Sequence, residues 1–228
     1  MQTANRYADR TQAGQVLATE LLSFAHRHDV IVLGLARGGV PVAAEIARAL
    51  HVEFDVFPVQ KLVVPADPDT TFGAIAPQSV HVIDNTRVQQ LQLSPDELAD
   101  QVLAAEAALA LQVRRYWRHR APLPLEGRRI ILADDGAASG WTLRAALAAL
   151  RTHGPQQIVV AVPVGDPQAC RELAAVCDRV ICPLQPAPFL ATGLWYVHFA
   201  AVTDDEVLEW LEAAHTTRSL GGRLNFFR

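Results

Sequence analysis

The chain has few cysteines, no long apolar run and no large excess of charge, and each absence argues against a class of protein. Its three cysteines, Cys170, Cys177 and Cys182, form no Cys-x-x-Cys pair, which leaves no basis for a disulfide framework or a zinc site. We therefore interpret them as packing residues and expect a reducing, cytoplasmic setting. No apolar run approaches the roughly 18 residues that a membrane span needs. The net charge of −4 gives no general attraction to nucleic acid or anionic membranes.

What the chain does contain is enough apolar sequence for a sizeable core. Half of its 228 residues are hydrophobic and 19% are charged, which fits one large domain. We expect that domain to span residues 1–215. The mixed polar and aromatic pattern of residues 216–228 predicts a C-terminal tail. Residues 1–10 are polar, so no secretory signal is expected there.

Short apolar runs alternate with stretches of helical periodicity along most of the chain. Strands are expected at residues 29–34, 54–59, 129–133, 158–162 and 179–182. Helices are expected at 10–27, from Pro41, from Leu143, at 167–176 and from Thr203. Continuous apolar strands separated by helices indicate an α/β fold with a parallel sheet covered on both faces. In such sheets, ligands bind beyond the carboxyl ends of the strands.

Residues 61–120 interrupt this alternation and are interpreted as an insertion. The Pro- and Asp-rich run at 64–71 predicts a mobile loop, with short strands near 73–76 and 80–83. The sequence Ser94-Pro-Asp-Glu97 combines an N-cap, a proline at the first helical position and a capping-box glutamate. It predicts a long helix that continues to about Arg118.

The stretch from Ile131 to Thr142, ILADDGAASGWT, carries the strongest functional signal. An apolar strand ends on Asp134 and Asp135, and small residues then precede a helix. Small side chains leave backbone N–H groups uncovered at a helix N-terminus, where the partial positive charge favours phosphate. Carboxylates repel phosphate but suit sugar hydroxyls or a cation, so the stretch predicts a sugar-phosphate site. A helix-capping turn with two solvated acids is the alternative.

The segment Leu132–Thr142 resembles the signature that binds 5-phosphoribosyl 1-diphosphate (PRPP) in type I phosphoribosyltransferases. That signature is an apolar strand, two acids, small residues and Thr/Ser-Gly-x-Thr. Further segments are similar to a bacterial branch of this family: Tyr7–Gly14, Leu33–Val42, Gly73–Ala76, Trp195-Tyr196 and Val202–Val207. The resemblance implies a parallel sheet flanked by helices, with a small hood in addition to the long inserted helix.

The resemblance assigns roles to the strand end and to the loop after it. Asp134 and Asp135 are expected to hold the ribose hydroxyls. The loop is expected to bind the 5′-phosphate through Ala137, Ala138, Ser139, Gly140, Trp141 and Thr142. Trp141 is the one bulky residue in this loop, and it either packs beneath the loop or covers the phosphate.

The resemblance also implies a site for the diphosphate group of PRPP. Arg37, Gly38 and Gly39 are similar to the diphosphate loop of the family, where glycines allow unusual backbone angles and close approach. Arg37 and Lys61 are candidates for neutralising the departing charge. The family uses Mg²⁺, held mostly by substrate oxygens and water, so we expect Mg²⁺ near the two aspartates without a compact cage of protein ligands.

The implied reaction is Mg²⁺-dependent transfer of a phosphoribosyl group from PRPP to a nitrogenous small-molecule acceptor, with release of diphosphate. Ala138 stands where 6-oxopurine enzymes resemble one another in carrying an aspartate, which argues against hypoxanthine and guanine as acceptors. Trp195 and Tyr196 are candidates for stacking on the acceptor or for packing within the hood. Gln60 replaces an arginine that is common in related enzymes, and this motivates the alternative of a PRPP-sensing protein with weak turnover.

The segment Arg114–Arg120 is basic with interleaved aromatic residues, a composition found in nucleic-acid contacts. Cations at the C-terminal end of a helix also interact favourably with the helix dipole. A solvated helix end or an oligomer contact is the favoured interpretation, so nucleic acid is not expected as a partner. Because related enzymes are commonly dimers, we expect a homodimer.

One variant tests the assignment of the acids directly. Replacing Asp135 with asparagine removes a charged acceptor of hydroxyl hydrogen bonds while keeping the size of the side chain. We expect Asp135→Asn to weaken PRPP binding at least 10-fold in calorimetry and to leave the circular dichroism spectrum unchanged. Unchanged affinity for PRPP would count against the sugar-phosphate interpretation.

Overall fold

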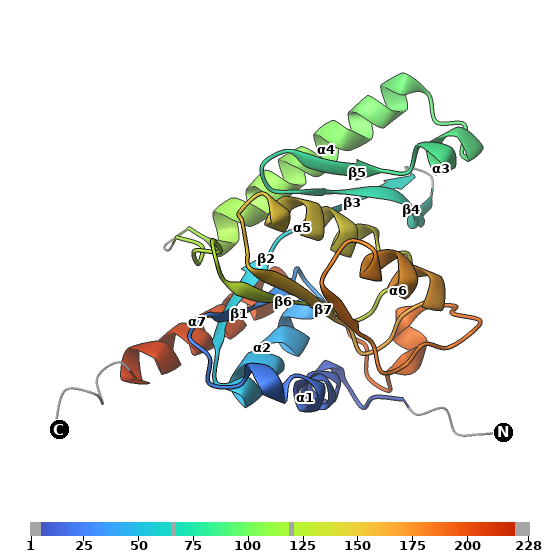
Figure 1. The fold of residues 1–228 in the computed structure, drawn as a ribbon. Helices are drawn as coiled ribbons and strands as arrows, with labels where there is room; N and C mark the ends of the chain where they lie inside the picture. Colours follow the sequence, from blue (N-terminus) through green and yellow to red (C-terminus); the bar gives the residue numbers. More distant parts are fainter. Residues whose placement is uncertain (1–5, 65–66, 119–120, 222–228) are drawn as a thin grey trace, which may run out of the picture.

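A five-stranded parallel sheet forms the centre of the computed structural model, with the strands in the order β2-β1-β6-β7-β8 (Figure 1). The structure describes residues 6–64, 67–118 and 121–221, with the backbone alone for 68–69 and 215–221. The strands of this sheet are β1 (Val30–Leu35), β2 (Glu53–Phe57), β6 (Arg129–Ala133), β7 (Gln157–Ala161) and β8 (Arg179–Ile181). The prediction of an α/β fold with a parallel sheet is therefore confirmed.

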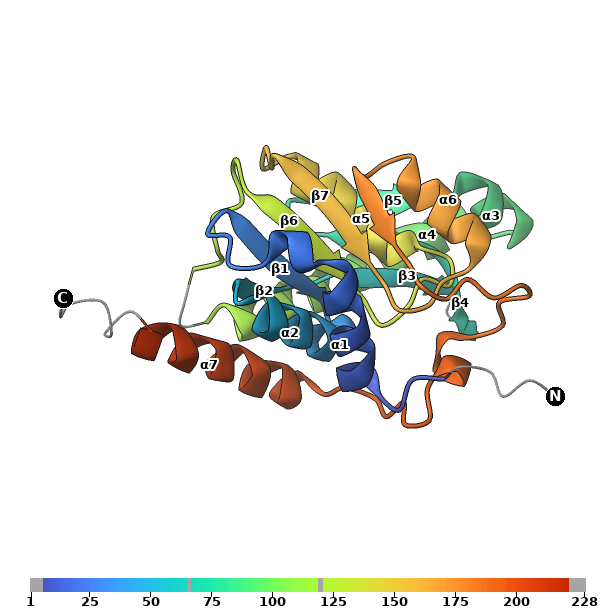
Figure 2. The ribbon, with the colours of Figure 1, turned by 60° about the horizontal axis from the view of Figure 1, so that its bottom comes forward.

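Helices cover both faces of this sheet. One face packs against α1 (Arg10–Glu20), α2 (Gly39–Leu50) and α7 (Asp204–Gly221). The other face packs against α5 (Trp141–Arg151) and α6 (Pro167–Ala174), as Figures 1 and 2 show. Successive side chains of a strand point to opposite faces. Val30 and Val32 accordingly belong to the first core, while Ile31 and Leu33 belong to the second.

The insertion forms a second, antiparallel sheet in the order β3-β4-β5. Its elements are β3 (Gln60–Val64), β4 (Asp67–Ala76), β5 (Val80–Ile83), α3 (Asn85–Gln90) and α4 (Pro95–Tyr116). The expectation of a mobile loop at 64–71 is wrong for residues 67–71, which belong to β4. Since β5 pairs only with residues 73–76, the proline-bearing half of β4 has β3 as its one strand neighbour. Proline is tolerated at such an edge.

The long inserted helix α4 starts where its capping box predicts. The Ser94 side chain accepts from the amide of Glu97, and Glu97 accepts from the amide of Ser94. Its inner face buries Ala105 and Leu109 against side chains of the small sheet, namely Leu62, Phe72 and Ile75. The insertion is attached to the main domain through β4, whose Ala74 and Ala76 pack in the same core as α5.

Several expected boundaries are wrong, among them the following three. The helix expected at 10–27 ends at Glu20, and a 3-10 turn (η1, Leu22–Phe24) follows. The helix expected from Pro41 begins at Gly39. Residues 216–221 of the expected tail continue α7, and residues 222–228 lie outside the described part. Within the described residues, no helix has the length and apolar character that crossing a membrane requires.

The capping box gives a prediction about the stability of the insertion. Ser94→Ala removes the acceptor for the Glu97 amide and should cost about 1 kcal/mol. For a domain of this size, that corresponds to a fall in Tm of about 2–4 °C. The matched control is Ser139→Ala, because the Ser139 side chain is exposed and bonds to no other described residue. Equal Tm values for the two variants in thermal unfolding would show that the cap is not stabilising.

Candidate functional site

Two loops at the carboxyl ends of neighbouring strands meet at one place. Strands β1 and β6 pair in register, with Gly34 opposite Ala133, so the loop after β1 lies beside the acids after β6. A Cβ atom added to Gly38 would lie 2.1 Å from Oδ2 of Asp135. One added to Gly39 would lie 2.8 Å from Cα of Asp134. The predicted diphosphate loop and the acid pair are therefore in direct contact.

Gly38 and Gly39 are required because a larger side chain would collide with the two aspartates, and their backbone angles do not require glycine. Gly38 has φ −60 and ψ −31, an ordinary helical conformation, and Gly39 is the first residue of α2 and is not among the glycines with positive φ. The expectation of unusual angles at these two glycines is wrong, and what the structure shows is their close contact with Asp134 and Asp135. The peptide bond between Ala36 and Arg37 is cis.

Asp135 is held by an arginine that sequence reasoning did not select as a site residue. Nη2 and Nε of Arg10 lie 2.8 and 2.9 Å from Oδ2 of Asp135. The same guanidinium lies 3.9 Å from the ring centroid of Phe199 and donates to the carbonyl of Ala200. The available signal was the Tyr7–Gly14 segment, which matched the family but suggested no role for Arg10.

Asp134 has a different environment from its neighbour. Its Oδ1 accepts from the backbone amide of Asp135 at 2.9 Å, and it has no ion-pair partner among the described residues. Burial raises the pKa of Asp134 well above the usual range, and the negative charge of Asp135 raises it further. The charges of Lys61 and Arg10 act in the opposite direction. Burial also raises the pKa of Asp135, and its pairing with Arg10 opposes this shift.

Each of the two carboxylates keeps one oxygen that bonds to no other described residue. These atoms are Oδ2 of Asp134 and Oδ1 of Asp135, since the hydrogen bonds from the Asp135 amide and from Arg10 use the other oxygen in each case. A pair of carboxylate oxygens at one strand end can accept hydrogen bonds from two adjacent hydroxyl groups. The arrangement therefore fits a vicinal diol.

The loop after the acids presents its amides at the N-terminus of α5. Gly140 adopts a left-handed conformation, with φ 72, which favours glycine at this N-cap. The amides and hydroxyls of residues 138–142 donate to no other group in the described part of the chain. Ala137 differs, because its amide donates to the carbonyl of Val164 at 2.9 Å. The expectation that the Ala137 amide binds phosphate therefore does not fit the structure.

Trp141 is the first residue of α5, and its half-buried side chain packs against the core shared with that helix. The guanidinium carbon of Arg144 lies 4.7 Å from the centroid of its ring. The structure therefore agrees with the interpretation that Trp141 packs against the core. A large side chain that packs there need not cover the amides of the loop.

The segment of residues 183–200, called the hood here, closes one side of the acid pair. Tyr196 is 1% exposed, and its hydroxyl donates to the carbonyl of Asp135 at 2.6 Å. Its ring contacts Tyr7 and Phe199, with centroids 5.7 and 4.9 Å away. Tyr196 thus has no free face for an acceptor base, and the stacking expectation is wrong for it. Trp195 is half-buried in the same cluster.

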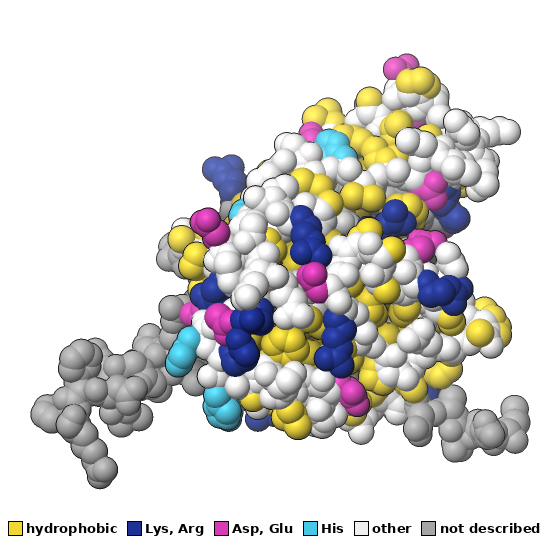
Figure 3. Space-filling view, in the orientation of Figure 1, with side chains coloured by type: hydrophobic (Ala, Val, Ile, Leu, Met, Phe, Trp, Pro, Cys, Tyr) yellow, Lys and Arg dark blue, Asp and Glu magenta, His cyan; other side chains and the backbone are white. Residues whose placement is uncertain are grey.

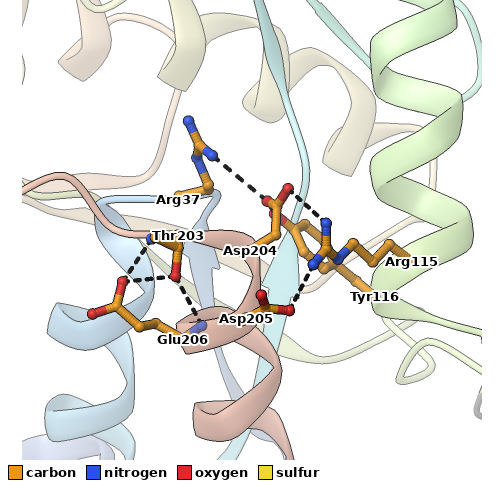
Figure 4. A network of polar contacts seen from close by, with 7 residues as sticks. All are labelled: Arg37, Arg115, Tyr116, Thr203, Asp204, Asp205 and Glu206. Atoms are coloured by element: carbon orange, nitrogen blue, oxygen red, sulfur yellow. Dashed lines mark hydrogen bonds and ion pairs between the residues drawn. The ribbon is translucent and has the colours of Figure 1, made fainter.

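Arg37 and Lys61, the two cations expected near the diphosphate, lie on different elements of the structure. Arg37 is half-exposed, and its Nη1 lies 3.9 Å from Oδ1 of Asp204 at the start of α7 (Figure 4). Asp204 also accepts a 2.5 Å hydrogen bond from Tyr116 and pairs with Arg115. Lys61 is exposed on β3, in the small sheet rather than at the end of β2. Its positive charge lowers the pKa of both aspartates.

Comparison with known proteins identifies the family of this chain. A family model described as a phosphoribosyl transferase domain matches residues 7–192. Two curated proteins from Mycobacterium tuberculosis strains, both named as a putative phosphoribosyl transferase, are 38% identical over 221 residues. The match covers 96% of this chain and 49% of each relative. The chain therefore spans about half the length of the curated relatives it matches.

Solved structures show the same fold. The crystal structure of TT1426 from Thermus thermophilus is 36% identical, with a TM-score of 0.72, and the match covers 90% of this chain and 99% of that one. The AQ2163 protein from Aquifex aeolicus matches at 11% identity and a TM-score of 0.50, over 77% of this chain and 74% of that one. The fold defines a domain of the α/β class with a central parallel sheet. The chain belongs to the phosphoribosyl transferase family.

The raised pKa of Asp134 predicts how stability depends on pH. A carboxyl group whose pKa is higher in the folded state stabilises the fold at low pH, and this contribution is lost as pH rises through the raised pKa. Asp134→Asn, which stays neutral, should therefore raise Tm by a few degrees at pH 8 and change it little near pH 3. The expected scale follows from about 2–4 °C per kcal/mol.

The measurement is thermal unfolding at both pH values without ligand. Glu126→Gln is the matched control, since Glu126 is exposed in a turn outside the helices and has no partner among the described residues, and it should change Tm at neither pH. A lower Tm for Asp134→Asn at pH 8 would contradict the account of the buried pair.

Proposed function

We propose that this domain transfers the phosphoribosyl group of PRPP to a nitrogenous acceptor other than hypoxanthine or guanine, with release of diphosphate. The observation that carries the proposal is the position of the uncovered amides of residues 138–142 beside the free oxygens of Asp134 and Asp135. One end of this site suits a phosphate, and the other suits a diol. Membership of the phosphoribosyl transferase family supports the same substrate.

In the proposed reaction, the bond from C1 of the ribose to diphosphate breaks and a bond from C1 to the acceptor nitrogen forms. Diphosphate leaves with the bonding electrons, and the acceptor nitrogen gives up a proton to solvent if it carries one. The 2′- and 3′-hydroxyls donate to the acid pair, and the 5′-phosphate accepts from the loop amides. This geometry fixes the sugar at both ends, so catalysis rests on positioning and on charge stabilisation.

Arg10 has a defined part in this arrangement. Its guanidinium forms an ion pair with Oδ2 of Asp135, so Oδ1 is available to accept a hydrogen bond from a hydroxyl group. An ionised carboxylate is a stronger acceptor than a neutral one, and the neighbouring cation favours ionisation. Lys61 acts on the same pair through its charge, and Arg37 lies at the start of the glycine loop, where the leaving diphosphate is expected.

The residues at the site fit the magnesium ion that the family uses. Carboxylate oxygens are preferred ligands of Mg²⁺, and Asp134 and Asp135 each have one oxygen without a described partner. The described residues hold no group of three or more His, Cys, Asp or Glu that could form a metal cage. A magnesium ion here would therefore take most of its ligands from PRPP and water. When bound, it would supply positive charge to the diphosphate oxygens.

A PRPP-sensing domain with little or no turnover is the second candidate. Two observations favour it. Gln60 stands where related enzymes often have a cation, and the guanidinium of Arg37 is directed toward Asp204 of α7 (Figure 4). A sensor would keep the sugar-phosphate site but leave the departing diphosphate poorly neutralised.

An assay of diphosphate release tests the proposal. The domain is incubated with PRPP, Mg²⁺ and a panel of nucleobases and amines, and released diphosphate is measured. We expect release with at least one acceptor, none with hypoxanthine or guanine, and a loss of at least 100-fold in Asp134→Asn/Asp135→Asn. Ser94→Ala is a suitable control, because its change lies far from the site and should leave the rate unchanged.

Calorimetry with PRPP and Mg²⁺ separates the two candidates. Binding of PRPP without release of diphosphate for any acceptor would favour the sensor. Absence of PRPP binding would contradict both functions, since both depend on the same site.

A further inference from the structure

The outward face of α4 is apolar and uncovered over its middle part. Leu103 and Leu111 are 66% and 67% exposed, and they lie on one side of the helix. Ala104, Ala107 and Ala110 lie exposed between them. The opposite face of the helix already packs on the small sheet. This stripe is therefore additional to the surface that holds α4 in the fold.

Charged residues continue the stripe at both of its ends. Residues spaced three, four or seven apart lie on the same side of a helix, which puts Asp96 and Asp100 at one end and Arg114 at the other. All three side chains are exposed and have no ion-pair partner among the described residues. The neighbouring charges do have partners: Glu106 contacts His81, and Arg115 pairs with Asp204 and Asp205.

These residues are arranged symmetrically on either side of Ala107 along the helix. Leu103 and Leu111 lie four residues on either side of it, and Asp100 and Arg114 lie seven residues on either side. At 1.5 Å per residue, seven residues correspond to about 10.5 Å along the helix. Apolar positions thus mirror apolar positions, and acidic positions mirror basic ones. A second α4 running antiparallel would present complementary groups along the whole stripe.

We propose that α4 is the contact between two copies of this chain, packed antiparallel about a two-fold axis through Ala107. In this arrangement Leu103 of one copy contacts Leu111 of the other, and Asp100 pairs with Arg114. A two-fold axis makes each contact occur twice. Alanine at the crossing point permits close approach of the two helices, because its side chain is small.

The position of α4 allows this contact. The helix lies at the outer edge of the molecule, on the side opposite α1 and α2 (Figure 1), and only its C-terminal end contacts α7, through Arg115 and Tyr116. Figure 3 shows apolar side chains among polar ones on the surface of the insertion, and also on the lower part of the same face. Since a single helix pair forms a small interface, we expect a dimer that dissociates on dilution rather than a permanent one.

Charge reversal tests the pairing by sedimentation equilibrium of the full chain. We expect wild type to form a concentration-dependent dimer. Asp100→Arg and Arg114→Asp should each weaken it at least 10-fold, because each places like charges opposite one another. The double variant Asp100→Arg/Arg114→Asp should restore the wild-type dissociation constant. Arg171→Asp, an exposed change on α6, is the matched control and should have no effect.

Cysteine crosslinking tests the axis independently. Ala107→Cys should form a disulfide-linked dimer on mild oxidation, because the two copies of residue 107 meet at the axis. Ala99→Cys should not, since its two copies would be about 24 Å apart along the helices. A monomer at all concentrations would overturn the proposal. So would a dimer that is insensitive to both single reversals and is not crosslinked through position 107.

Discussion

The interaction on which the site depends is the placement of two adjacent carboxylates at the buried end of β6. Neighbouring negative charges that lose contact with water are unfavourable unless cations or hydrogen-bond donors are supplied. The protein supplies a direct ion pair from Arg10, the longer-range charge of Lys61 and the amide of Asp135. Two carboxylate oxygens remain without a described partner, and a ligand carrying two hydroxyls and a cation satisfies both.

Several distant segments converge because this charge must be held in place. Arg10 from α1, Tyr196 from the hood and the glycines of the β1–α2 loop all contact the acid pair. A side chain at Gly38 would displace the carboxylate of Asp135. Tyr196 is buried, and its hydroxyl keeps a raised pKa, so it remains a donor to the Asp135 carbonyl. The hood therefore supports the acid pair through Tyr196.

The sequence was sufficient to predict the parallel sheet and the meeting of two loops at its edge. Both depend on local signals: apolar strands, small residues and acids at strand ends. Arg10 was missed because its partner is 125 residues away, and no local pattern reports a contact of that length. The same limit explains the wrong prediction for Ala137, whose amide donates a hydrogen bond to the carbonyl of Val164 at the end of another strand. The prediction of a loop at 64–71 was wrong for residues 67–71 because these residues form part of β4, which pairs with β3 despite its proline and aspartate residues.

We propose that the acid pair and the uncovered amides form one site for a ribose phosphate. An NMR titration of the amide resonances with PRPP and Mg²⁺ tests this proposal. We expect the amide signals of residues 138–142 to move on addition of PRPP, whereas the signal of the Ala137 amide, which is bonded to Val164, should move little. Loop signals that stay in place while PRPP binds elsewhere would show that the site is not here.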